Sequence, residues 1–262
     1  MISSDDRRPS AVSRDAWLTE RRALLEREKA HTRERDALNV ARRQLPWVHV
    51  TKPYRFDGVE GPVGLHELFA HRSQLIVRHF MFGPDWEEGC KGCSFGSDHM
   101  DGILPHLENH DVSYVAVSRA PLEKLMAFQA RMGWRFRWVS SFSSDFNQDF
   151  GVTFTPAQMD SGERLYNYGS APAFCDELPG LSVFFRDESG EVYHTYSAYG
   201  RGTEITDGAY MLLDLTPKGR NETGPNFNLM DWVKLRDQYP APATPMETKS
   251  ARGMSDSPTP DR

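Results

Sequence analysis

Two cysteines, Cys90 and Cys93, are the residues in this chain whose spacing is best suited to chemistry. They follow an apolar segment, residues 75–82, that is typical of a buried strand, and they precede residues 94–109, which we expect to form a helix. Two cysteines on the first turn of a helix can close a small disulfide, and the unpaired N–H groups of that turn stabilise a thiolate. Redox chemistry of thiols is therefore the leading hypothesis.

In dithiol exchange, one cysteine attacks as a thiolate and the second resolves the mixed disulfide. By position, Cys90 is expected to be the nucleophile and Cys93 the resolving cysteine. The positive charge of Lys91 favours a Cys90 thiolate, whereas the carboxylates of Glu87 and Glu88 oppose it. We expect a lowered pKa at Cys90 because it lies nearer the helix end. Trp86, four residues before Cys90, lies in a loop that could carry contacts to substrate.

Metal binding is the alternative chemistry for the same cysteines. Cys90, Cys93 and a histidine could bind copper or zinc. His99 and His106 fall on the predicted helix, and His99 would lie about 9 Å along the axis from Cys93, too far to share one ion. His194, in a predicted hairpin, could approach only through tertiary folding. A metal-binding or chaperone protein thus stays open, as does a non-catalytic interaction module whose cysteines are inert.

Composition excludes several other classes. The chain has 262 residues, 39% of them hydrophobic and 26% charged, which is ordinary for one main domain with additions. A net charge of -6 argues against a nucleic-acid partner. No segment resembles a membrane span or a signal peptide, so we expect no membrane association and a cytoplasmic location. Three cysteines are too few for a disulfide scaffold, and no phosphate loop or dinucleotide fingerprint appears, so no cofactor is expected.

The two ends of the chain differ from its middle. Residues 1–12 and 240–262 are polar and are expected to be disordered. Residues 13–46 are rich in helix formers and mixed charge up to Pro46, which predicts one long charged helix. Its apolar residues cluster at its two ends, so the middle is expected to be solvated. A dimer contact through those ends is left open.

Residues 47–239 alternate strand and helix signals, as in an α/β fold. Residues 187–190 read Asp-Glu-Ser-Gly between two strand patterns, which is a clear hairpin signal. The expected strands are residues 54–56, 75–82, 112–118, 134–139, 181–186 and 192–196. The expected helices are residues 65–70, 94–109, 121–132, 204–215 and 229–238.

The chain also resembles a known family. Residues 75–84 (LIVRHFMFGP), 89–94 (GCKGCS) and 196–202 (YSAYGRG) are similar to a bacterial family of unknown function, number 899, which is usually labelled thioredoxin-like or predicted dithiol-disulfide oxidoreductase. The resemblance covers about residues 14–240. It implies a thioredoxin-like fold, with a central mixed sheet flanked by helices and the long N-terminal helix as an extension. It also implies a disulfide-bearing protein or a small-molecule thiol as the partner.

Two residues further along gain an interpretation from this resemblance. Thioredoxin-like proteins place a cis proline against the active-site disulfide, just before the hairpin strand, and Pro179 resembles that residue. If so, Cys175 could lie near Cys90, as a third redox thiol or a metal ligand. The other interpretation of Cys175 is a buried, inert cysteine.

A more distant similarity is to peroxiredoxins of the alkyl hydroperoxide reductase kind. It rests on residues 117–121 and 145–152. Those proteins carry a threonine or serine shortly before the reactive cysteine, and no hydroxyl residue stands between Pro84 and Cys90. Peroxidase activity is therefore not carried over by this similarity.

Overall fold

The computed structural model describes residues 9–161, 165–173, 175–222 and 230–240. The expected disorder of residues 1–8 and 241–262 therefore concerns residues outside this part. In the described residues, eight strands form one mixed sheet in the order β1-β10-β9-β4-β5-β6-β2-β3. These strands are β1 (Val48–His49), β2 (Arg55–Gly58), β3 (Gly61–Gly64), β4 (Gln74–His79), β5 (Val112–Ser118), β6 (Arg137–Ser140), β9 (Gly180–Arg186) and β10 (Val192–Tyr199). A separate small pair consists of β7 (Leu165–Tyr166) and β8 (Ala171–Pro172).

The centre of the sheet combines parallel strands with an antiparallel hairpin. β4 pairs in parallel with β5, and β5 pairs in parallel with β6. On its other side β4 pairs with β9, which turns back into β10 as the predicted hairpin. The expected strand over residues 112–118 is confirmed with the same bounds.

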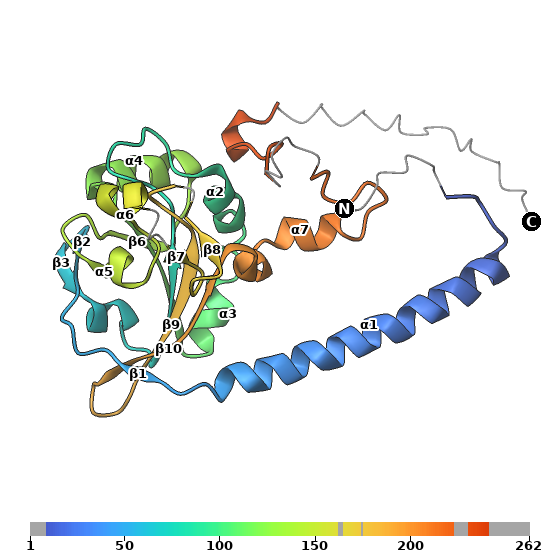
Figure 1. Cartoon of the computed structure of the whole chain (residues 1–262), viewed down its shortest axis with the longest axis horizontal. Coiled ribbons are helices and arrows are strands. Elements are labelled where there is room, and N and C mark those ends of the chain that lie inside the picture. The colour runs from blue at the N-terminus through green and yellow to red at the C-terminus, as the bar shows by residue number, and fades with distance from the viewer. Residues whose placement is uncertain (1–8, 162–164, 174, 223–229, 241–262) are drawn as a thin grey trace, which may run out of the picture.

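Helices cover both faces of this sheet (Figure 1). The α-helices are α1 (Arg14–Arg43), α2 (Lys91–Ser97), α3 (Leu104–Asn109), α4 (Leu122–Met132), α5 (Phe146–Asp149), α6 (Pro156–Ser161) and α7 (Gly208–Leu213). The 3-10 helices are η1 (Leu65–Phe69), η2 (Gly200–Thr206) and η4 (Arg236–Gln238). None of the helices in the described residues is long and apolar enough to cross a lipid bilayer.

Each face of the sheet carries its own core, because successive side chains of a strand point to opposite faces. The α2-face core includes Phe80, Phe82, Cys93, Met100, Tyr114, Ala116, Leu125, Phe128, Met132, Trp134, Phe136 and Trp138. The α5-face core includes Phe56, Leu65, Leu68, Phe69, Leu75, Val77, Val115, Val117, Val139, Phe146 and Phe184. The cysteine pair therefore belongs to one face of the sheet only.

The long N-terminal helix is confirmed. Ser13 caps α1, since the Ala16 N–H donates to its Oγ over 3.3 Å. The helix ends at Arg43, and its C-cap residue Gln44 lies two residues before Pro46. It has no buried residue and extends away from the sheet as a free rod (Figure 1).

The helix expected over residues 94–109 is wrong in extent, because the structure divides it into α2 and α3. The turn between them contains Asp98 and Asp101, whose carboxylates accept hydrogen bonds from Trp134 Nε1 and from the Arg135 N–H. In this turn the backbone bonds from His99 to Gly96 and from Met100 to Ser97 span three residues instead of four. Pro105 lies in the first turn of the second helix, which begins at Leu104. Tertiary contacts thus override the local pattern.

Two C-terminal helices also differ from expectation. The helix expected over residues 204–215 is divided at Asp207 into η2 and α7. Of the helix expected over residues 229–238, residue 229 lies outside the described part, and only η4 forms in the remainder. By contrast, the expected helix over residues 121–132 is confirmed as α4, with Gly133 in the left-handed conformation (φ 66°) directly after it.

Candidate active site

The cysteine pair lies where the chain leaves β4 and enters α2. Cys90 is the residue directly before α2 and is half-buried, whereas Cys93 lies within α2 and is 2% exposed. The Cys90 N–H donates to the Met81 carbonyl over 3.0 Å, and the Ser94 N–H donates to the Cys90 carbonyl over 2.9 Å. These bonds hold Cys90 at the edge of the α2-face core. Both sulfurs are free thiols in this structure.

The two thiols have opposite tendencies to ionise. The Cys93 thiol donates a hydrogen bond to Cys90, and with the N–H groups of Cys93 and Gly92 it lowers the pKa of Cys90 to about 6, against the opposing effect of burial. The same hydrogen bond, together with burial, raises the pKa of Cys93. The direction agrees with the lowered pKa expected at Cys90, but the largest cause is the Cys93 thiol and the N–H groups of the helix end come after it. Cys93 holds its proton while Cys90 is ionised.

Arg78 is a site residue that our sequence analysis missed. It lies on β4, is 4% exposed, and its positive charge favours the thiolate form of both Cys90 and Cys93. Its Nη1 lies 3.5 Å from Thr206 Oγ1, and the buried carboxylate of Asp207 lies beside it. The available signal was an arginine, next to His79, inside residues 75–82, whose other members are apolar. Lys91, the cation that the sequence indicated, is exposed on the first residue of α2.

Glycines let α2 pack closely against its surroundings. A Cβ added to Gly96 would lie 2.4 Å from Asp207 Oδ1, and one added to Gly92 would lie 2.6 Å from Met230 Sδ. One added to Gly89 would lie 2.7 Å from the Phe80 ring. Contacts this short do not occur, so a Cβ at any of these positions would force the neighbouring side chain to shift.

The loop before Cys90 is held from the side of α4. Lys124 Nζ donates to the carbonyls of Pro84 over 2.9 Å and Trp86 over 3.2 Å. Arg131 forms an ion pair with Glu88 over 2.5 Å. Trp86 is half-buried and packs against the α2-face core that contains Cys93.

Cys175 packs against the same core as the pair. It is half-buried between the α2-face core and a smaller cluster around Val152, Leu178 and Tyr199. Burial raises the pKa of its thiol, which therefore keeps its proton at neutral pH. The expectation of a cis bond at Pro179 is wrong, since no cis peptide bond occurs in the described residues. The Pro179 carbonyl accepts a hydrogen bond from the Tyr166 hydroxyl.

His194 does not join the cysteines. It packs against Phe150 and Phe184 on the α5 face, and its Nε2 lies 2.7 Å from Ser197 Oγ. Within the part of the chain that is described, no three His, Cys, Asp or Glu side chains gather in a way that could hold a metal ion. The set Cys90, Cys93 and His194 is therefore not brought together.

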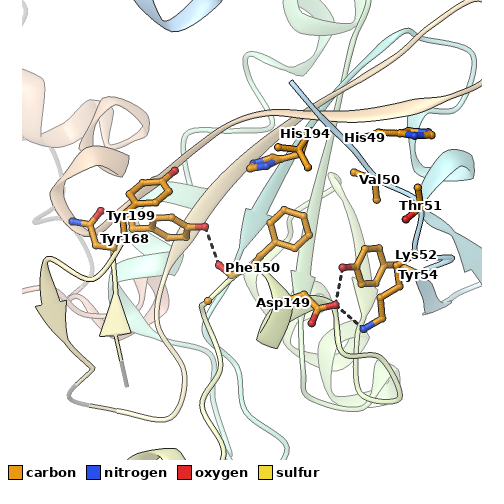
Figure 2. A pocket seen from close by; sticks show the side chains of 13 residues that line it. His49, Val50, Thr51, Lys52, Tyr54, Asp149, Phe150, Tyr168, His194 and Tyr199 are labelled. Carbon is orange, nitrogen blue, oxygen red and sulfur yellow. Dashed lines mark hydrogen bonds and ion pairs between the residues drawn. The ribbon is translucent and has the colours of Figure 1, made fainter. Parts of the chain in front are cut away.

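Instead, His194 lines a pocket of about 530 Å³ on the α5 face. Figure 2 shows Tyr54 and Lys52 pointing at Asp149, which accepts hydrogen bonds from Tyr54 over 2.7 Å and Lys52 over 2.6 Å. A buried chain of hydrogen bonds runs from His194 through the hydroxyls of Ser197 and Ser182 to His79. This pocket is separated from the cysteines by the sheet.

The strand order and the site together define a class of protein. Parallel β4 and β5 beside the β9-β10 hairpin, with a Cys-x-x-Cys pair where β4 passes into α2, form a thioredoxin-like α/β fold with a long N-terminal helix added. The chain belongs to the family described as bacterial protein of unknown function (DUF899), whose model matches residues 6–239. A search of curated proteins finds no match.

Several solved structures are similar to this chain. A cysteine-to-serine mutant of Xanthomonas campestris peroxiredoxin Q shows 16% identity and a TM-score of 0.42, covering 65% of this chain and 95% of its own. Peroxidoxin BcpB from Mycobacterium tuberculosis shows 13% identity and a TM-score of 0.41, covering 63% and 93%. A putative thiol:disulfide interchange protein DsbE from Chlorobium tepidum shows 14% identity and a TM-score of 0.40, covering 64% and 95%.

Proposed function

We propose that this protein is a thiol-disulfide oxidoreductase in which Cys90 attacks and Cys93 resolves. The observation that carries the proposal is the opposite ionisation of the two thiols, with the pKa of Cys90 lowered to about 6 and that of Cys93 raised. A nucleophilic thiol must be ionised near neutral pH, and its partner must stay protonated until the mixed disulfide has formed.

In the first step, the Cys90 thiolate attacks one sulfur of a substrate disulfide. The Cys90–substrate bond forms, the substrate S–S bond breaks, and the departing substrate thiolate takes up a proton. Cys93 then loses its proton and attacks Cys90 Sγ, which releases the second substrate thiolate. The substrate gains two electrons and two protons, and the pair becomes a disulfide that a small-molecule or protein thiol reduces again.

The surroundings of Cys93 suit its late ionisation. Two effects that raise the pKa of Cys93, its hydrogen bond to the Cys90 thiolate and the negative charge of that thiolate, disappear once Cys90 is in a mixed disulfide. The Arg78 charge and the Met81 N–H, which lies 3.4 Å from Cys93 Sγ, then remain to stabilise a Cys93 thiolate. Arg78 is thus proposed as a positioning charge for both steps.

We assign the substrate to the class of disulfide-bearing proteins or small-molecule disulfides, handled in a reducing compartment such as the cytoplasm. Trp86 is proposed to contact substrate, because it lies in the loop that leads to Cys90. Lys91 is exposed beside Cys90 and suits an acidic substrate group. Cys175 is proposed as an accessory thiol near the pair. Pro179 is proposed only to position the chain that follows Cys175.

The proposal is tested by equilibrating the full chain in glutathione buffers, alkylating free thiols and identifying each cysteine by mass spectrometry. We expect a reversible Cys90–Cys93 disulfide, also in the Cys175→Ser variant. The Cys93→Ser variant should instead accumulate a mixed disulfide at Cys90. Metal analysis of the same sample belongs to the test. A stoichiometric metal bound through the pair, or two thiols that never oxidise reversibly, would overturn the proposal.

A further inference from the structure

Four apolar side chains on or just after α1 follow a seven-residue spacing. Trp17, Leu24 and Leu38 lie on this helix, and Leu45 follows its end, each 44–49% exposed. Position 31 of the same series holds His31. Because seven residues are close to two helical turns, these side chains form one stripe along the helix. The stripe, residues 17, 24, 31, 38 and 45, is apolar at both ends and polar at its centre.

The described part of the chain does not bury this stripe. α1 has no buried residue, and its last turn meets the sheet where the Arg42 guanidinium lies over the Tyr196 ring. Figure 1 shows the remainder of the helix running free of the domain. A helix of 30 residues is about 45 Å long. Helices in proteins gain most of their stability from packing of an apolar side, so a partner for this stripe is expected.

We propose that two copies of this chain pair through α1 in antiparallel orientation, centred near His31. The spacing of the stripe is the same in both directions from that centre. In an antiparallel pair Trp17 therefore lies opposite Leu45, and Leu24 opposite Leu38 of the other copy. The polar centre of the stripe, at His31, lies against His31 of the other copy. The partner is thus a second copy, because the stripe is complementary to its own reverse.

Charge and the helix dipoles favour the antiparallel orientation. Residues 14–30 carry five basic and four acidic residues, whereas residues 32–43 carry four basic and two acidic residues. A parallel pair would place the two more positive halves together. An antiparallel pair places each of them beside the less positive half of the other copy and opposes the two helix dipoles.

Disulfide crosslinking in the full chain tests this arrangement. In a background with Cys90→Ser, Cys93→Ser and Cys175→Ser, we expect the His31→Cys variant to give a covalent dimer on oxidation. Leu24→Cys and Leu38→Cys should each give none alone, and the double variant should give one. Covalent dimers from Leu24→Cys alone and from Leu38→Cys alone would show a parallel pair and overturn the orientation. A monomeric mass by light scattering would overturn the pairing itself.

A pair of charge substitutions tests the stripe. Leu24→Glu with Leu38→Glu should weaken dimerisation by at least about 100-fold, since four leucines per dimer lose their burial. Val40→Glu is the matched control, because Val40 is 44% exposed on α1 but lies on the side away from the stripe. Helix content by circular dichroism should be similar in both variants. Equal weakening by the control would overturn the assignment of the stripe.

Discussion

Met81 holds both cysteines of the candidate site: its N–H lies 3.4 Å from Cys93 Sγ, and its carbonyl accepts a hydrogen bond from the Cys90 N–H over 3.0 Å. This residue follows β4, the strand that carries Arg78. The central strand therefore positions the pair through its backbone and sets its charge through one side chain. Substitution of Cys93 or of Arg78 should therefore appear first as a change in the titration of Cys90.

The first prediction concerns the hydrogen bond between the two thiols. In the Cys175→Ser protein, the alkylation rate of Cys90 should follow a pKa of about 6. Cys93→Ala should move this pKa upward, because the thiol that donates to the Cys90 thiolate is lost. Cys93→Ser keeps a donor and should move it less. A titration midpoint at or above 9, the ordinary value, would contradict the assignment.

The second prediction concerns the buried charge. Arg78→Met should raise the pKa of Cys90, and it should reduce the free energy of unfolding by about 3–5 kcal/mol because Asp207 loses its neighbouring cation. Arg78→Lys keeps the charge and should restore much of the Cys90 titration. Combining Arg78→Met with Asp207→Asn should destabilise less than the sum of the single changes. Urea unfolding and thiol alkylation measure both effects, and an unchanged Cys90 pKa in Arg78→Met would rule out the electrostatic role.

The third prediction concerns the close packing of α2. Gly96→Ala should destabilise the protein by about 1–3 kcal/mol, because the added Cβ falls 2.4 Å from Asp207 Oδ1. In an open helix the same change would stabilise by about 1 kcal/mol. Gly102→Ala is the control, since a Cβ there meets nothing within 4 Å. If both variants unfold at the same urea concentration, the close approach of Gly96 to Asp207 does not determine the stability of the protein.

The fourth prediction is a pH dependence set by Glu177. Burial raises the pKa of this carboxyl to about 7 from 4.5, even though Arg119 lies 2.8 Å away. The folded state therefore binds this proton more tightly than the unfolded state. The contribution of this proton to the free energy of unfolding is fully present below pH 4.5 and is lost as the pH rises through 7.

The Glu177→Gln variant has no titrating group at this position. The difference in free energy of unfolding between variant and wild type therefore reports the titration of Glu177 alone. Between pH 5 and 8, the free energy of unfolding of the variant relative to the wild type should rise by about 2–3 kcal/mol. Urea unfolding of both proteins at four pH values gives this difference directly. A difference that does not change with pH would show that Glu177 is ionised alike in both states.

Much of the framework was predictable because it rests on local patterns. Residues 112–118 are mostly apolar or β-branched and form β5 with the expected bounds. The hairpin turn at residues 187–190 and the end of α4 at Gly133 follow from backbone preferences of single residues. The position of Cys90 and Cys93 at the start of α2 follows from the same strand-to-helix order.

Where distant residues compete with local ones, the sequence was a weaker guide. Residues 94–109 were expected to form one helix, but Gly102 and Pro105 disfavour its continuation, and the bonds from Asp98 and Asp101 to the loop after α4 hold the turn that divides it in two. The trans bond at Pro179 accompanies a hydrogen bond from Tyr166, 13 residues away. Neither contact leaves a periodic signal in the chain.

The amino-acid sequence alone thus determined the order of the central strands β4, β5, β6, β9 and β10, the long α1 and the place of the two cysteines, because each depends on neighbours within a few residues. Only the tertiary structure decided that Arg78 and Asp207 meet beside α2, that Cys175 packs on the same core as Cys93, and that His194 lies on the other face of the sheet. Those relationships depend on which face of a strand each side chain takes and which strands become neighbours. Long-range pairing of the sheet sets both.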